Sequence, residues 1–284
     1  MEHVNQLELI DIIAEKVKAI RKPGDYEEDG LLYCGNCKTP KQGRLSIGNR
    51  VRIVACQCSC AAKQYAEEQN NIAAEQKRIR VEQLRSDGIR DKSLTTCSFE
   101  DSVSTPELDK LKGYADRWDE MEKKNIGLLL WGNTGNGKTF GAACVANQLI
   151  DNGVPVMITS FPKILSSAFD KQDIVEQMHY YPLVVIDDLG AERQSDYALE
   201  TVYMVIDERY KAKKPLIITT NLTLDEICKP KNMKLQRIYD RVLEMCSPIA
   251  FKGDSIRRVK ARENAAAAAK MLANTEKDGA YERP

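Results

Sequence analysis

The sequence has no long apolar run, no excess of charge of either sign and almost no histidine. Its longest apolar runs, such as those at 128–131 and 183–186, are far shorter than the roughly 20 residues that a membrane helix needs. Lys and Arg (42) balance Asp and Glu (42), so no global basic field is present to attract nucleic acid. The opening residues, MEHVNQLELIDII, are acidic before they are apolar, unlike a secretory signal, so we expect a cytoplasmic protein without membrane contact.

Cysteine, in contrast, is frequent and clustered. Five of the nine cysteines fall between Cys34 and Cys60, and disulfides are disfavoured in the cytoplasm. Cys34 and Cys37 form a C-x-x-C pair, and a second group follows about 15–20 residues later, a spacing typical of Cys₄ zinc sites. The two histidines, His3 and His179, lie elsewhere in the sequence, so the ligands of such a site would all be sulfur.

The second group offers three thiols for two ligand positions. We predict Cys58 and Cys60 as zinc ligands beside Cys34 and Cys37, with Cys56 as the alternative. A redox role for the C-x-x-C pair needs a thioredoxin-like strand and helix around it, which the flanking residues do not provide. Because a unit of about thirty residues cannot bury a sufficient core, the zinc ion would be structural. The other cysteines are predicted to be ordinary buried thiols: Cys97, Cys144, Cys228 and Cys246.

Changes in composition predict four segments along the chain. They are an N-terminal helix with the zinc unit (1–62), a helical linker (63–92), an α/β domain (93–262) and an Ala-rich helix with a polar tail (263–284). Apolar residues recur every three or four positions over 4–20, which predicts an amphipathic helix. Its apolar face could pack on its own domain or dock a partner protein, and the sequence favours neither.

The α/β domain is predicted from short apolar runs that alternate with helical stretches. The runs occupy residues 127–131, 154–159, 183–187, 215–220 and 248–251. Buried strands that alternate with helices indicate a mostly parallel sheet covered on both faces.

A phosphate-binding loop follows the first of these runs. Residues 132–139 read GNTGNGKT and match G-x-x-x-x-G-K-[ST], which arises by chance in about one in a hundred chains of this length. Glycines let the backbone N–H groups surround the phosphates, Lys138 reaches the β- and γ-phosphates, and the Thr139 hydroxyl ligates Mg²⁺. The residues expected around the nucleotide are Gly132, Asn133, Thr134, Gly135, Asn136, Gly137, Lys138, Thr139 and Phe140.

Polar side chains at the ends of two further runs would complete this site. Asp187 ends the run 183–187, and Asp188 follows it. One carboxylate can hold the Mg²⁺ shell while the other orients or deprotonates water, although paired acids at a strand end also cap helices. Asn221 can hold the attacking water near the γ-phosphate or form a simple turn.

Three arginines lie further along the chain. Arg237 and Arg241 are four residues apart, on one face of a predicted helix, and Arg257 comes later. Such arginines usually form a solvated or salt-bridged face. The functional alternative is that one of them reaches the γ-phosphate bound to a neighbouring subunit. Phe161 is a candidate for stacking on DNA bases, but sequence alone does not distinguish it from a core residue.

The motifs GNTGNGKT, LVVIDDLG, TTNL, RIYDRV and DSIRR occur in this order over about residues 93–262. Together they resemble the AAA+ ATPases of the DnaC/DnaI helicase-loader and IstB group. The resemblance implies an AAA+ ATPase domain whose five-stranded parallel sheet is flanked by helices. It implies the following roles: Walker A for Lys138 and Thr139, Walker B for Asp187 and Asp188, sensor I for Asn221, arginine finger for Arg241 and the ATP-contacting sensor II for Arg257.

The same resemblance implies partners. Loaders of this group bind a hexameric replicative helicase and single-stranded DNA, and they oligomerise through ATP-bridged interfaces. A zinc module before the AAA+ core looks like the DnaI arrangement, in which that module contacts the helicase. We therefore expect an ATP-dependent helicase loader that uses ATP, Mg²⁺ and Zn²⁺.

Two alternatives remain. One is a transposition helper ATPase of the IstB kind, which acts as a DNA-bound filament and has a similar core. The other is a zinc-bearing adaptor that uses ATP only as a binding switch, which the intact Lys138, Thr139, Asp187 and Asn221 disfavour.

Overall fold

The computed structural model of the chain describes residues 19–48, 50–166, 171–190, 195–230, 232–253 and 255–275. The chain divides into two compact units, Met1–Arg78 and Ile79–Pro284, and each is described by itself. Within the described ranges, no helix has both the length and the apolar character needed to cross a bilayer. Most of the predicted amphipathic helix (4–20) and of the polar tail lies outside the described residues.

The first unit is built from two short antiparallel ribbons. β1 (Tyr26–Glu28) pairs with β2 (Leu31–Tyr33), and β3 (Gln42–Ile47) pairs with β4 (Arg50–Ala55). Among the described residues of this unit, the buried hydrophobic side chains are those of Leu32, Cys34 and Cys58. Apolar burial this small cannot stabilise a fold by itself.

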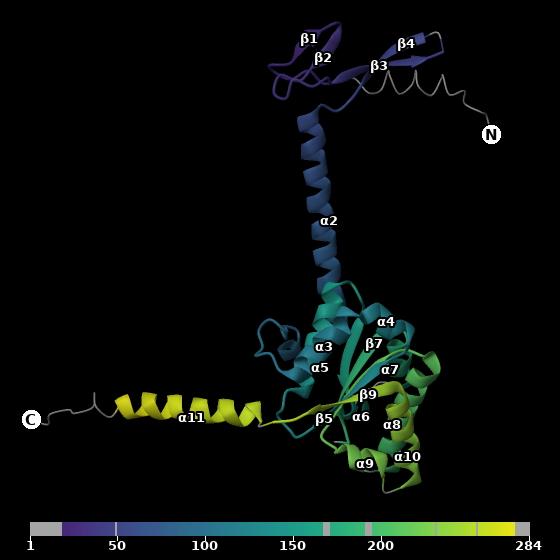
Figure 1. The fold of residues 1–284 in the computed structure, drawn as a ribbon, viewed down its shortest axis with the longest axis vertical. Helices are drawn as coiled ribbons and strands as arrows, with labels where there is room; N and C mark the ends of the chain where they lie inside the picture. Colours follow the sequence, from purple (N-terminus) through teal and green to yellow (C-terminus); the bar gives the residue numbers. More distant parts are fainter. Residues whose placement is uncertain are drawn as a thin grey trace, which may run out of the picture. The chain divides into compact units, whose positions relative to one another are not determined.

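The second unit contains a five-stranded parallel sheet (Figure 1). Its strands are β5 (Gly127–Gly132), β6 (Val156–Ser160), β7 (Leu183–Leu189), β8 (Leu216–Thr220) and β9 (Cys246–Phe251). Their order across the sheet is β6-β7-β8-β5-β9, and every neighbouring pair is parallel. The predicted α/β class and the five parallel strands are confirmed, and each strand overlaps one of the predicted apolar runs.

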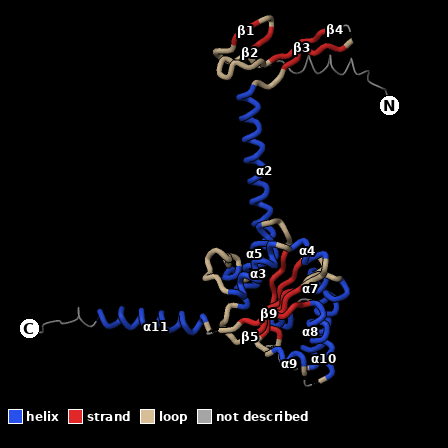
Figure 2. The backbone as a smooth tube through the Cα atoms, viewed as in Figure 1, coloured by secondary structure: helices blue, strands red, loops and turns tan. Residues whose placement is uncertain are grey.

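Helices cover both faces of this sheet, with α3 and α5 on one side and α8 and α10 on the other (Figures 1 and 2). The first face carries the end of α2 (Ser59–Gly88), α3 (Pro106–Asp116), α4 (Trp118–Lys123) and α5 (Lys138–Asp151). The second carries α6 (Phe161–Ser166), α7 (Lys171–Met178), α8 (Asp196–Ala212), α9 (Leu224–Cys228) and α10 (Met233–Met245). The turn η1 (Lys92–Leu94) precedes α3, and α11 (Ile256–Thr275) follows β9.

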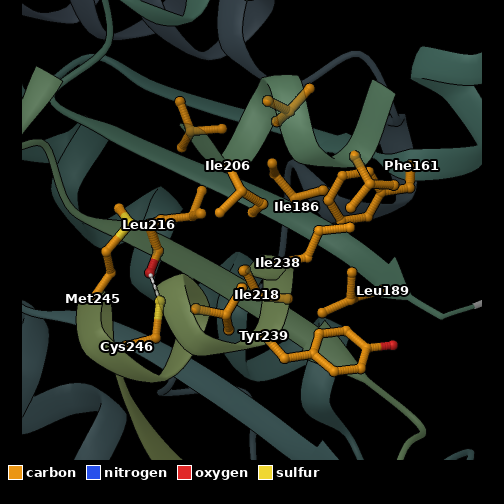
Figure 3. Packing of buried hydrophobic residues seen from close by; sticks show 14 of the residues in the cluster. Phe161, Ile186, Leu189, Ile206, Leu216, Ile218, Ile238, Tyr239, Met245 and Cys246 are labelled. Atoms are coloured by element: carbon orange, nitrogen blue, oxygen red, sulfur yellow. Dashed lines mark hydrogen bonds between the residues drawn. The ribbon is translucent and has the colours of Figure 1, made fainter. Parts of the chain in front are cut away.

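Alternation along the strands explains the two layers. Leu129 of β5 belongs to the hydrophobic cluster under α8 and α10, whereas Leu128 and Leu130 belong to the cluster under α3 and α5. Successive strand side chains point to opposite faces, so a run that is apolar throughout must be covered on both. Figure 3 shows the hydrophobic cluster under α8 and α10. Phe161 is fully buried in it, so this residue is part of the core and does not present its ring to DNA.

The isolated cysteines differ in their exposure. Cys144 and Cys246 are buried as predicted, and burial raises the pKa of each thiol to about 12. The Cys246 thiol also donates to the Leu216 carbonyl at 3.3 Å (Figure 3). The prediction of burial is wrong for Cys228, which is exposed, and for Cys97, which is half-buried. Cys228 ends the short surface helix α9 and Cys97 lies in the loop after η1, so neither occupies a covered strand or a core-facing helix position.

Candidate nucleotide and metal sites

Three neighbouring strands end at the same edge of the sheet. β5 leads into the phosphate-binding loop (residues 132–139), β8 leads into Asn221, and β7 ends with Asp187, Asp188 and Leu189. The carboxyl ends of parallel strands form the crevice in which open α/β sheets bind ligands. The fold therefore brings together side chains that lie far apart in the sequence.

The glycines of the loop allow its tight path. Gly132, Gly135 and Gly137 all have positive φ values of 139°, 88° and 90°. A Cβ at Gly135 would lie 2.2 Å from the Ser255 hydroxyl, and one at Gly132 would lie 2.3 Å from the carbonyl of Phe251. Gly137 is also the N-cap of α5 and provides no side-chain cap, so the helix presents its positive amino end to the loop.

Lys138 is buried at the centre of the site. Its Nζ donates to the carbonyl oxygens of Gly132 and Asn133, both at 2.8 Å, and to Oδ1 of Asn221 at 2.9 Å. These three bonds use all the donors of the ammonium group. Burial lowers the pKa of Lys138, while the charges of Asp188 and Asp187 oppose that shift. The lysine and Asn221, predicted separately, are direct partners in the structure.

Asp187 is held by two hydroxyl groups. Thr139 Oγ1 donates to Asp187 Oδ1 at 2.8 Å, and Thr219 Oγ1 of the neighbouring strand donates to the same oxygen. A hydroxyl and a carboxylate in contact are the oxygen ligands that Mg²⁺ prefers. The donor set at Thr139 and Asp187 therefore fits this ion. Sequence reasoning missed Thr219, because the pairing of its strand with β7 is visible only in the structure. The available signal was its position in the run 215–220, two residues before Asn221.

Asp188 sits in an irregularity of β7. The pairing of β7 with β8 shifts register between Ile186 and Leu189, and Asp188 has a left-handed φ of 60°. Its backbone N–H donates to the Thr219 hydroxyl at 3.0 Å. Bulges of this kind redirect side chains next to active sites. Burial, and next the charge of Asp187, raise the pKa of Asp188, while Lys138 and Arg257 oppose the shift.

Four other residues predicted to contact the nucleotide lie in different surroundings. Asn136 is buried and its Nδ2 donates to the carbonyls of Phe251 and Gly253, at 3.2 and 3.1 Å, which ties the loop to the end of β9. Arg257 is exposed near the start of α11, and its charge acts on both Lys138 and Asp188. Thr134 is exposed, and Phe140 packs on the α3 and α5 side of the core.

Arg241 lies on α10 and contacts α8 rather than the phosphate-binding loop. Its Nη1 lies 2.5 Å from Oδ1 of Asp207, and its guanidinium covers the ring of Tyr203. Arg237, one turn earlier, is exposed. Within its own chain, the guanidinium of Arg241 is therefore engaged by α8.

The predicted zinc ligands form one cluster. The four Sγ atoms of Cys34, Cys37, Cys58 and Cys60 all lie within 4.8 Å of one another. Cys56 is outside it, exposed, with its thiol directed at the Pro40 carbonyl. Hydrogen bonding with Thr39 lowers the pKa of Cys37 to about 5, whereas the adjacent sulfurs of Cys58, Cys34 and Cys37 raise that of Cys60 to about 12. Four thiols this close together suit a thiophilic divalent cation.

Asp25, which sequence reasoning did not single out, fixes the first cysteine turn. It accepts from the backbone N–H of Gly35 at 3.0 Å and pairs with Lys41 at 2.6 Å. The bond from Lys41 lowers the pKa of Asp25. A Cβ at Gly35 would lie 2.0 Å from the Gly24 carbonyl, so the turn approaches the preceding loop as closely as the backbone allows.

The sheet order, the glycine loop and the convergence of Lys138, Thr139, Asp187 and Asn221 define a P-loop nucleotide-binding protein with an AAA+ type of core. Comparison with known proteins gives the family. The sequence profile of the IstB-like ATP binding proteins matches residues 69–265, and the chain belongs to this family.

Curated relatives include replicative helicase loaders and a protein of a phage-like element. The chain is 27% identical over 150 residues to the replicative helicase loader DnaI of Bacillus subtilis, a match that covers 47% of this chain and 48% of that protein. It is 28% identical over 183 residues to the replicative helicase loader DnaC of Escherichia coli, covering 59% and 72%. It is 25% identical over 260 residues to the phage-like element PBSX protein XkdC of Bacillus subtilis, covering 84% and 90%.

Among solved structures, a crystal structure of DnaI aligns with a TM-score of 0.50 at 23% identity, over 58% of this chain and 96% of that one. At this identity the likeness supports the fold alone. The match to the Bacillus subtilis loader spans about half of its length.

Proposed function

We propose that the protein is a Mg²⁺-dependent ATPase that binds a replicative helicase and loads it onto single-stranded DNA. The observation that carries the ATPase part is the bonded set of Lys138, Asn221, Thr139 and Asp187 at one sheet edge. Membership of an ATP-binding family and the loader relatives support the rest. Such a protein would act in the cytoplasm, where the replicative helicase works.

The residues of the site suit hydrolysis of the terminal phosphate. Lys138 would exchange its carbonyl partners for the β- and γ-phosphate oxygens, while the amino end of α5 adds positive potential. Asn221, released from Lys138, would orient the attacking water. A bond then forms between the water oxygen and the γ-phosphorus, the bond from that phosphorus to ADP breaks, and Asp188 accepts the proton of the water. Its raised pKa makes Asp188 a better base than an ordinary aspartate.

Mg²⁺ would be held by Thr139 and, directly or through water, by Asp187, and when bound it neutralises charge on the phosphate oxygens. Thr219 keeps the Asp187 carboxylate oriented. Zn²⁺ would be held by Cys34, Cys37, Cys58 and Cys60 and would be structural, because these residues lie in a unit with little apolar core.

Assembly is part of the proposal. Arg241 would act as the arginine finger on ATP held by a neighbouring subunit, and Arg257 would contact ATP in its own subunit. A trans arginine contributes about 10³–10⁵ in rate, so the isolated chain should hydrolyse ATP slowly. The neutral net charge argues against strong intrinsic DNA affinity, so any single-stranded DNA binding should weaken steeply with salt.

Two experiments test this function. The wild-type protein should release phosphate from ATP in a Mg²⁺-dependent way, and Lys138→Ala should not. Phosphate release that persists in Lys138→Ala would refute the assignment of the ATP site. If the assembled wild type releases no phosphate, the protein is instead an adaptor that uses ATP only as a binding switch. Affinity purification should recover a hexameric helicase, and chelator should abolish this recovery if the zinc module makes the contact. Recovery of a transposase instead would identify a transposition helper.

A further inference from the structure

Three side chains of α8 surround the guanidinium of Arg241. Asp207 Oδ1 lies 2.5 Å from its Nη1, and its Cζ lies 4.6 Å and 5.4 Å from the ring centroids of Tyr203 and Tyr210. Residues 203, 207 and 210 follow the spacing of one helix face, so a single face of α8 supplies all three groups. We call Tyr203, Asp207 and Tyr210 the α8 clamp.

The clamp is itself supported. Asp207 also pairs with Lys211 at 2.8 Å, and the Tyr210 hydroxyl donates to Glu244 of α10 at 3.0 Å. The side chain of Asp207 is 13% exposed and that of Arg241 is 26% exposed. The guanidinium of Arg241 is therefore restrained at Nη1 by a carboxylate and near Cζ by two rings, while part of the side chain remains exposed to solvent.

A second arginine shows what a purely structural one looks like in this fold. Arg209, also on α8, is fully buried and donates to the backbone carbonyls of Met178, Tyr181, Pro182 and Pro215. Each of the two arginines has one buried nitrogen without a hydrogen-bond partner, Nε in Arg209 and Nη1 in Arg241. Arg241 differs because its guanidinium faces a carboxylate and two aromatic rings instead of backbone carbonyls. Its restraint comes from charge and from two aromatic faces, which fix the plane of a guanidinium without using its donors.

We propose that Tyr203, Asp207 and Tyr210 are positioning residues that pre-orient Arg241 for the phosphate of a neighbouring subunit. This inference rests on the proposed function, because it assumes that Arg241 acts in trans. An arginine fixed before contact loses less side-chain freedom when it binds, and a misplacement of about 1 Å can cost about 10²-fold in rate. The clamp would therefore affect turnover in the assembly and not ATP binding by the same chain.

A mixture of two full-length variants tests the inference. The donor carries Asp188→Asn, which should hydrolyse ATP more slowly by about 10²-fold or more but keeps Arg241. The acceptor carries Arg241→Ala, which keeps its own ATP site. Neither alone should show assembly-stimulated turnover, and the mixture should restore it.

Asp207→Asn is then added to one partner at a time. In the donor it should lower kcat of the mixture about 10- to 100-fold with KM for ATP unchanged. In the acceptor, where Arg241 is absent, it should change neither constant, which also controls for folding. Glu208→Gln is the matched control in the donor, since Glu208 pairs with Lys211 but not with Arg241, and it should leave kcat unchanged. Tyr203→Phe in the donor keeps the ring and should keep kcat, whereas Tyr203→Leu should lower it.

The outcomes separate the two proposals. If the mixture of Asp188→Asn and Arg241→Ala shows no turnover although both variants bind ATP and assemble, the trans role of Arg241 is wrong and the clamp inference falls with it. If the mixture turns over but Asp207→Asn has equal effects in donor and acceptor, or raises kcat, the trans role survives and the positioning role is refuted.

Discussion

The zinc cluster gives a prediction that separates two neighbouring cysteines. Cys58 is a member of the four-sulfur cluster, while Cys56, two residues earlier, is exposed and outside it. We expect Cys58→Ser to lose zinc and Cys56→Ser to keep it. The two variants make the same chemical change at almost the same point of the chain, so each controls for the other.

The magnitude follows from how little else stabilises this unit. Full burial of a leucine contributes about 1.5–3 kcal/mol, and Leu32 is the one aliphatic side chain buried among its described residues. A structural zinc site supplies about 10–16 kcal/mol at neutral pH. Changing a residue that only supports a ligand weakens metal binding about 10- to 100-fold. Removal of the Cys58 thiolate, a ligand itself, should weaken zinc binding by more than about 100-fold. This loss of affinity corresponds to more than about 2.8 kcal/mol of binding free energy.

Two measurements check this prediction. Zinc content after dialysis against a weak chelator should be about one ion per wild-type or Cys56→Ser chain and close to none for Cys58→Ser. Limited proteolysis should then cleave Cys58→Ser within residues 19–60, while the second unit stays intact and its ATP binding is unchanged. Zinc retained by Cys58→Ser but lost by Cys56→Ser would refute the ligand assignment, and a protease-resistant first unit without zinc would refute the structural role.

Three further predictions concern the second unit. The pKa of Asp188 is raised above 3.8 in the native protein, so this residue binds a proton more tightly there than in the unfolded chain. Without ATP, the free energy of unfolding should therefore fall as the pH rises from about 3.8 through the native pKa of Asp188. Asparagine tolerates the left-handed backbone of this position, so Asp188→Asn should fold. The variant should lose this pH dependence in thermal unfolding, and its ATP turnover should fall by about 10²-fold or more. An unchanged dependence of Tm on pH would contradict the raised pKa of Asp188. Arg209→Met leaves several buried carbonyls without their donor, each at a cost of about 1–3 kcal/mol, so we expect a loss of about 3–5 kcal/mol and a Tm lower by roughly 6–20 °C. KM for ATP should stay constant, because those carbonyls precede β7 and β8. Asn136→Ala removes two hydrogen bonds to the β9 end and should weaken binding of a fluorescent ATP analogue about tenfold, and equal affinity would show that this tie does not shape the loop.

The sequence alone determined the local chemistry of this protein. The glycine loop could be recognised because positive φ and close backbone approach are properties of a few adjacent residues, and Gly132, Gly135 and Gly137 have them in the structure. The strands could be recognised because an apolar run must be covered on both faces wherever it lies. The family assignment followed from the same short motifs and is confirmed over residues 69–265.

Tertiary structure decided which residues meet. The sequence offers Cys56, Cys58 and Cys60 for two ligand positions, and our choice of Cys58 and Cys60 kept Cys56 as the alternative. The path of the chain after β4 places Cys58 and Cys60 in the cluster and Cys56 outside it. Thr219 supports Asp187 and Asp188 because β8 pairs with β7, a relation between strands that no local pattern encodes. The α8 clamp on Arg241 likewise depends on the packing of α10 against α8. Hydrogen bonds and ion pairs between distant segments depend on register and helix rotation to within about an ångström, and sequence patterns specify periodicity, not relative position.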